Sequence, residues 1–81
     1  MTNTEKLNDI IRESGYKRLF IASALGISAN ALSHKIINKT EFKPSEIVIL
    51  CDLLGLDAST RDDIFFADRV DFKSTLIKME E

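Results

Sequence analysis

The chain has 81 residues, 44% of them apolar and 30% charged, with three glycines and one proline. This composition suits one small, helix-compatible globular domain and leaves no room for a second core. One cysteine and one histidine exclude an intramolecular disulfide framework and a zinc site with three or four protein ligands. The net charge of −2 argues against nucleic acid as a partner, because domains that bind nucleic acid are usually basic.

The apolar residues do not form a segment that could cross a membrane. The longest unbroken apolar run covers residues 47–51, whereas a membrane helix needs ~20 residues. The N-terminal residues also lack the apolar core of a signal peptide. We therefore expect a cytoplasmic protein that contacts no membrane and needs no metal ion or other cofactor.

The charge is divided unevenly along the chain. Residues 1–45 hold seven basic and four acidic residues, a net +3, whereas residues 46–81 hold four basic and nine acidic residues, a net −5. Such a split within one domain suggests two faces with different partners, or one binding face and one solubilising face.

Apolar residues at helical spacing predict three helices in the first half of the chain. They are expected over residues 4–14, 17–25 and 29–37. In the first of them, Leu7 and Ile11 lie four residues apart and share a face. Gly15 and Gly26 stand where left-handed C-caps would end the first two helices. Ser28 is a good N-cap for the third.

Two further helices are expected in the second half of the chain. Pro44 suits the first turn of a fourth helix over about residues 44–54, which is the most hydrophobic element. A fifth, short helix is capped by Asp57 or Ser59 and ends in the apolar residues 64–66.

These helices predict an all-α, compact five-helix domain over residues 1–67, followed by a short C-terminal arm over residues 68–81. In the arm, Val70 and Phe72 alternate as they would in a strand, although the segment as a whole has no clear period. We expect an ordered arm that contributes to dimerisation.

The most informative stretch is residues 18–37, which read RLFIASALGISANALSHKII. Two helices joined by a short turn can cross at about 90–120° if the turn accepts an unusual backbone angle and the residue at the crossing is small. Gly26 meets the first need and Ala22 the second. Four apolar residues would face inward in this arrangement: Ile21, Leu25, Ile27 and Leu32.

With Ala22, Gly26 and Leu32 at its small, turn and buried aliphatic positions, this segment resembles the helix-turn-helix of the lambda-repressor-like (Cro/XRE) family. The resemblance covers about residues 4–66, the whole five-helix domain of that family. Residues 25–47 are similar to small phage-type members that read "LGIS…LS.KI.NK..F…EI". The resemblance implies a DNA-binding transcriptional regulator, a phage or mobile-element repressor or Cro-like protein that occupies operator DNA.

In that family the second helix of the motif enters the major groove and its N-terminal residues read base edges. The resemblance assigns this role to Ser28, Ala29, Asn30, Ser33 and His34. The side chain of Asn30 can make two hydrogen bonds to adenine, whereas Ala29 can only touch a thymine methyl group. Ser33 and His34 can donate or accept at purine edges. Many phage repressors carry glutamine where Ala29 stands.

Basic residues gather around the motif. Five of them are expected to contact DNA phosphates: Lys17, Arg18, Lys35, Lys39 and Lys43. Over residues 15–45 they face only one acid, Glu41, which leaves a local net charge of +4. Such contacts position a domain on DNA without reading its sequence. The family usually has an aliphatic residue at the position of Lys35, and Ile36 can supply that packing one residue later.

Some apolar residues exceed what the core of such a domain needs, and they form a candidate protein interface. The set comprises Leu19, Phe20, Val48, Ile49, Leu53, Val70 and Phe72. A homodimer built from the fourth and fifth helices and the arm would cover part of it. Dimers allow domains of this kind to read two half-sites one helical turn apart.

Two functions therefore stay open. In the first, the protein is a transcriptional regulator that binds double-stranded operator DNA. The alternative is a modulator or antirepressor that keeps the helix-turn-helix fold, binds another helix-turn-helix regulator and masks its DNA-binding surface. The −5 half, the surplus apolar residues and Ala29 favour the alternative. An enzyme is not expected, because the sequence has no glycine-rich phosphate loop, nucleophile elbow or cluster of metal ligands.

Overall fold

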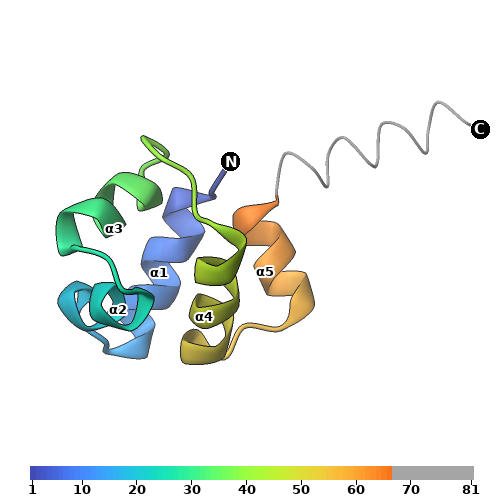
Figure 1. The fold of residues 1–81 in the computed structure, drawn as a ribbon. Helices are drawn as coiled ribbons and strands as arrows, with labels where there is room; N and C mark the ends of the chain where they lie inside the picture. The colour runs from blue at the N-terminus through green and yellow to red at the C-terminus, as the bar shows by residue number, and fades with distance from the viewer. Residues whose placement is uncertain (67–81) are drawn as a thin grey trace, which may run out of the picture.

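Five α-helices follow one another in the computed structural model, which describes residues 1–66 (Figure 1). Their bounds are α1 Thr4–Ser14, α2 Arg18–Leu25, α3 Ala29–Ile36, α4 Pro44–Leu54 and α5 Ala58–Phe65. Residues 1–66 contain no strand, so the prediction of an all-α five-helix domain is confirmed. None of these helices has the length and apolar character needed to span a membrane. The predicted arm over residues 68–81, with Val70 and Phe72, lies outside the described residues.

The helix bounds agree with the predicted ones to within one residue at the ends of α2 and α3. Lys17 has the extended ψ of 148° of an N-cap, so α2 begins one residue after it. Ile37 is the C-cap of α3 rather than its last helical residue. Of the two expected caps of α5, Asp57 is the one that acts, because its side chain accepts a hydrogen bond from the N–H of Thr60 at 2.7 Å.

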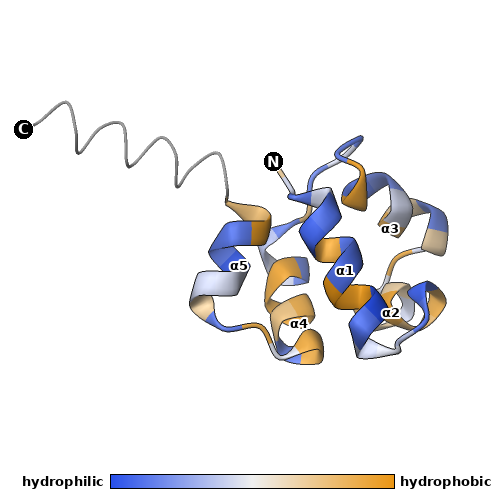
Figure 2. Cartoon of the chain, turned by 180° about the vertical axis from the view of Figure 1, so that it is seen from behind, coloured by the Kyte–Doolittle hydropathy of each residue, from blue (hydrophilic) through white to orange (hydrophobic). Residues whose placement is uncertain are grey.

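All five helices contribute to one core. The largest side chains without exposed surface are Leu7, Ile21, Leu32, Ile36, Leu50 and Ile64. Removing each of them from water contributes about 1.5–3 kcal/mol to folding. The rings of Phe42 and Phe65 add an edge-to-face contact, with centroids 5.4 Å apart, between the α3–α4 loop and α5. Figure 2 shows α4 as apolar along most of its length, as its sequence predicts.

The turn between α2 and α3 has the geometry expected at the crossing of the motif. Gly26 has φ 72° and ψ 28°, and its N–H donates to carbonyl oxygens of the last turn of α2. The N–H of Ile27 donates to the carbonyl oxygen of Ala22 at 3.0 Å, and Ala22 itself has no exposed surface. Only residues 26–28 separate α2 from α3, and Leu32 is directed into the core.

Replacing Gly26 by alanine tests this turn. A side chain at φ 72° is strained, although no atom lies within 4 Å of the place that its Cβ would take, so the cost is confined to the backbone. We expect Gly26→Ala to lower the free energy of unfolding by about 1–2 kcal/mol, as measured by urea denaturation. The control is Ser23→Ala on the exposed side of α2, which should change it by less than about 0.5 kcal/mol. An unchanged stability of the Gly26 variant would contradict the role given to the turn.

Candidate nucleic-acid interface

The exposed side of α3 carries the residues predicted to read bases. Ser28 caps the helix by accepting a hydrogen bond from the N–H of Ala31 at 3.0 Å. Ser28 and Asn30 are exposed, and Ala29, Ser33 and His34 are partly exposed. The opposite side of the helix is buried through Leu32, Lys35 and Ile36. The structure therefore brings the five predicted residues together on the part of α3 that the core does not cover.

Three of these side chains have hydrogen-bonding groups that are not used within the described part of the chain. The side chains of Asn30, Ser33 and His34 make no hydrogen bond or ion pair to another residue of the range 1–66. Because Asn30 and His34 are four residues apart, and Ser33 is three residues after Asn30, they are neighbours on the helix surface. No other residue of the range 1–66 therefore competes with a ligand that lies along α3 for their amide, hydroxyl and imidazole groups.

Four of the five predicted phosphate contacts are exposed. Lys17, Lys39 and Lys43 are exposed and form no ion pair with the described residues. Arg18 is also exposed, and its guanidinium group donates to the side-chain oxygen of Asn8 at 2.6 Å and forms no ion pair within residues 1–66. Lys39 lies at the C-terminal end of α3, where its N–H donates to the carbonyl oxygen of His34 at 2.9 Å.

The fifth, Lys35, does not belong to this set, and the structure corrects its assignment. Its residue surface is only 9% exposed. Its ammonium nitrogen lies 3.0 Å from the carboxylate of Glu46 on α4 and donates to the carbonyl oxygen of Glu41 at 3.0 Å. The spacing of Leu32, Lys35 and Ile36 already placed the lysine on the buried side of α3, and Ile36 is buried beside it rather than in its place.

Glu46 is the buried partner of Lys35, with 5% of its surface exposed. Burial by itself raises the pKa of this carboxyl group. The hydrogen bond from the backbone N–H of Lys43, the hydrogen bond from the side chain of Lys35 and the positive charge of Lys35 all lower it. Together they outweigh burial, so the pKa lies below its ordinary value. The carboxylate is therefore ionised at neutral pH and completes a buried ion pair between α3 and α4.

The predicted protein interface is exposed in part. Leu19 is 70% exposed, Phe20 51%, Val48 60% and Ile49 37%, whereas Leu53 is partly buried against the core. Sequence reasoning missed Tyr16 and Ile37, which are exposed as well. The ring centroids of Tyr16 and Phe20 lie 5.1 Å apart, a contact that helical spacing does not predict because Tyr16 precedes α2.

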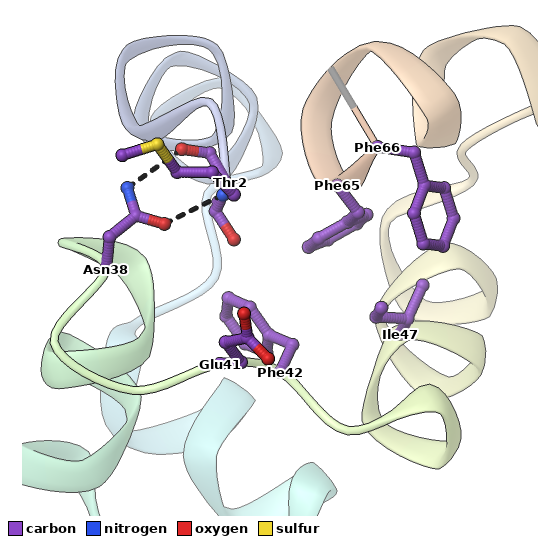
Figure 3. Close-up of a pocket in the computed structure, with 8 residues that line it drawn as sticks. Thr2, Asn38, Glu41, Phe42, Ile47, Phe65 and Phe66 are labelled. Atoms are coloured by element: carbon purple, nitrogen blue, oxygen red, sulfur yellow. Dashed lines mark hydrogen bonds between the residues drawn. The ribbon is translucent and has the colours of Figure 1, made fainter. Parts of the chain in front are cut away.

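A hollow of about 510 Å³ lies between the N-terminus, the α3–α4 loop and the end of α5 (Figure 3). Its apolar lining comes from Phe42, Ile47, Phe65 and Phe66. On one side the amide of Asn38 binds the backbone of Thr2 through hydrogen bonds of 2.7 and 2.9 Å. These bonds tie the N-terminus to the segment that follows α3.

Comparisons of the chain with family models, with curated proteins and with solved structures found no match. Membership of the lambda-repressor-like family therefore stays a prediction that rests on residues 18–37 and on their agreement with the five-helix fold.

Replacing Glu46 by glutamine tests the buried pair. The amide oxygen can still accept the N–H of Lys43, but the charge opposite Lys35 is lost. We expect Glu46→Gln to lower the free energy of unfolding at pH 7 by about 1–3 kcal/mol. Because the folded-state pKa is lowered, the stabilisation is complete above the unfolded pKa of about 4.3 and is lost as the pH falls through the folded pKa.

The difference in unfolding free energy between wild type and Glu46→Gln should therefore be constant near neutral pH and shrink below about pH 4. Chemical denaturation at a series of pH values measures it. The matched control is Glu13→Gln on the exposed side of α1, which should follow the wild type throughout. A difference that grows on acidification would contradict the assignment of an ionised Glu46.

Proposed function

We propose that the protein is a DNA-binding transcriptional regulator of phage or mobile-element type that occupies operator DNA through α3 in the major groove. The observation that carries this proposal is the arrangement of α3. One side of the helix is buried behind the turn at Gly26, and the other presents Asn30, Ser33 and His34, whose hydrogen-bonding groups no other residue of the range 1–66 uses. A helix of this kind fits the width of the major groove.

Base reading depends on the chemistry of these side chains. The amide of Asn30 matches the donor and acceptor pattern of adenine, and Ser33 and His34 bond the edges of purines. Ala29 and Ser28, at the start of the helix, touch the neighbouring bases, with Ala29 against a thymine methyl group. The specificity therefore depends mainly on Asn30.

Phosphate contacts come from the exposed bases around α3. Lys17 and Arg18 at the start of α2, Lys39 after α3 and Lys43 before α4 supply them. These charges lie in the half of the chain with net charge +3, so the overall net charge of −2 does not prevent DNA binding. Binding of this kind releases counterions and weakens as salt is added.

The regulator acts in the cytoplasm as a homodimer. The exposed side chains of Val48 and Ile49 on α4 support a contact between two copies, since exposed apolar neighbours often mark an interface. Two copies related by a two-fold axis would place their α3 helices in half-sites about 34–36 Å apart on the DNA.

A second function is supported by the apolar surface at the start of α2. Leu19 and Phe20 are the most exposed large apolar residues of that helix, and Tyr16 extends the surface through its ring contact with Phe20. In this alternative the protein is a modulator or antirepressor that binds another helix-turn-helix regulator through this surface and masks its DNA-reading helix.

Salt titration tests the phosphate contacts. A duplex selected by the protein from a random-sequence library is titrated at several salt concentrations. We expect Lys39→Ala to reduce the slope of log K against log salt by about 0.9, as for one lost phosphate contact. Lys6→Ala is the control, because Lys6 lies on α1 and pairs with Asp63 at 3.0 Å, and should keep the wild-type slope. A wild-type slope near zero would exclude the proposed function.

Base reading is tested by Asn30→Ala. We expect it to weaken binding to the selected duplex by about 1–3 kcal/mol and to remove the preference at one base position only. Repeating the selection with the variant measures this change. Equal affinity of the wild type for all duplexes, or a loss of preference at every position in the variant, would contradict the role of Asn30.

The alternative is tested by Leu19→Ser combined with Phe20→Ser. If the protein masks a regulator encoded beside it, the wild type should release that regulator from its DNA and the double variant should not. Val48→Ser, which changes an exposed apolar residue on α4, is the control and should release it like the wild type. Release by the double variant would rule out the α2 surface as the contact.

A further inference from the structure

One carboxylate oxygen joins the C-terminal half of α3 to the start of α4. The Oε1 atom of Glu46 accepts the backbone N–H of Lys43 at 2.8 Å and lies 3.0 Å from the ammonium nitrogen of Lys35. The same ammonium group donates to the carbonyl oxygen of Glu41 at 3.0 Å. α3 is thereby bonded at two points to the segment that follows it.

Packing alone does not account for a charged pair at this place. Leu32 and Ile36 are fully buried on the same side of α3 as Lys35, so an aliphatic side chain would continue the core. Taking two charges out of water costs several kcal/mol for each ion, and apolar replacement of a buried pair is often neutral or stabilising. The pair restrains the orientation of the groups that it joins, because hydrogen bonds constrain both distance and angle.

The pair restrains the helix that carries the proposed base readers. Lys35 follows His34 directly and lies on the opposite side of α3 from Asn30. A rotation of α3 about its axis that moved Asn30 and His34 would therefore break both bonds of Lys35. The turn at Gly26 holds the N-terminal end of the helix. The pair acts on its C-terminal half, where the hydroxyl of Thr4 also donates to the carbonyl oxygen of Ile36.

We propose that Lys35 and Glu46 are positioning residues that fix the rotation of α3 and so decide which bases its exposed side chains reach. The consequence at DNA rests on the proposed function, whereas the restraint on α3 can be measured without DNA. The pair therefore contributes to specificity more than to stability.

The test replaces the charges without removing the cap of α4. In Lys35→Met/Glu46→Gln, an apolar side chain fills the space of the lysine, and the glutamine oxygen still accepts the N–H of Lys43. Lys35→Leu/Glu46→Gln is a second neutral version with a shorter side chain. Urea denaturation should give both about the wild-type free energy of unfolding, as neutral replacement of a buried pair often does. If both versions unfold, the pair is a source of stability and the proposal is overturned.

The restraint itself is measured by amide hydrogen exchange of the free protein. We expect the amides of residues 32–37 to exchange about tenfold faster in the neutral versions than in the wild type, because local opening of α3 becomes easier at unchanged global stability. Unchanged exchange would overturn the proposal. This readout does not depend on DNA, so it decides the restraint even if the wild type fails to bind any duplex.

The consequence for specificity is measured with the selected duplex and a scrambled duplex of the same composition. We expect the ratio of the two affinities to fall about tenfold in the neutral versions, as for one misplaced base contact, while the salt slope stays at its wild-type value. Lys35→Arg, which keeps a cation opposite Glu46, should restore much of the ratio. An unchanged ratio would refute the link between the pair and base reading.

A control variant separates the buried lysine from the exposed ones. Lys39→Met removes a charge beside α3 that forms no ion pair within residues 1–66. It should lower the salt slope and the affinity for both duplexes alike, and leave the exchange of residues 32–37 unchanged. If Lys39→Met lowered the ratio of affinities as much as the neutral versions do, the loss of specificity would come from the lost positive charge and not from a change in the position of α3.

Discussion

The short turn at Gly26 is the constraint on which the arrangement of the other helices depends. Only residues 26–28 separate α2 from α3, so α3 has to start close to the end of α2, and the small side chain of Ala22 lets the two helices meet there. This placement directs Leu32 into the core. It follows that the other side of α3, with Asn30 and His34, is left outside.

The acidic second half of the chain has structural uses of its own within the described residues. Asp57 caps α5, Asp63 pairs with Lys6 of α1, and Glu46 pairs with Lys35 of α3. The two ion pairs connect the second half of the domain to the first. The negative charge of the second half is therefore not by itself a sign of a protein partner, and the stronger reason to expect one is the exposed apolar surface of α2 and α4.

Much of the fold could be predicted from the sequence because its signals are local. Glycines at helix ends, polar caps such as Ser28, and apolar residues three or four apart predicted five helices within one residue of their bounds. The buried state of Lys35 was missed because lysine is expected at the surface, and the expectation gave less weight to its position between Leu32 and Ile36. Its partner Glu46 is eleven residues away in the sequence, and the two charges come together only because α3 and α4 both pack against α1 and α2.

The exposed surfaces could be predicted in part. Leu19 and Phe20 were predicted to exceed what the core needs, and both are exposed. The contact of Tyr16 with Phe20 was not expected, since it depends on the conformation of the link between α1 and α2. The residues on these surfaces constrain the chemical character of a binding partner. They do not determine its identity, which depends on the other molecule.

The most direct test of the account is to map where DNA contacts the protein. A titration of isotope-labelled protein with the selected duplex, followed by NMR, reports changes at every backbone amide and at the side-chain amide of Asn30. We expect the largest changes on residues 28–34 and on that side chain, with smaller ones at Lys17, Lys39 and Lys43. Changes confined to residues 16–20, or none with any duplex, would contradict it.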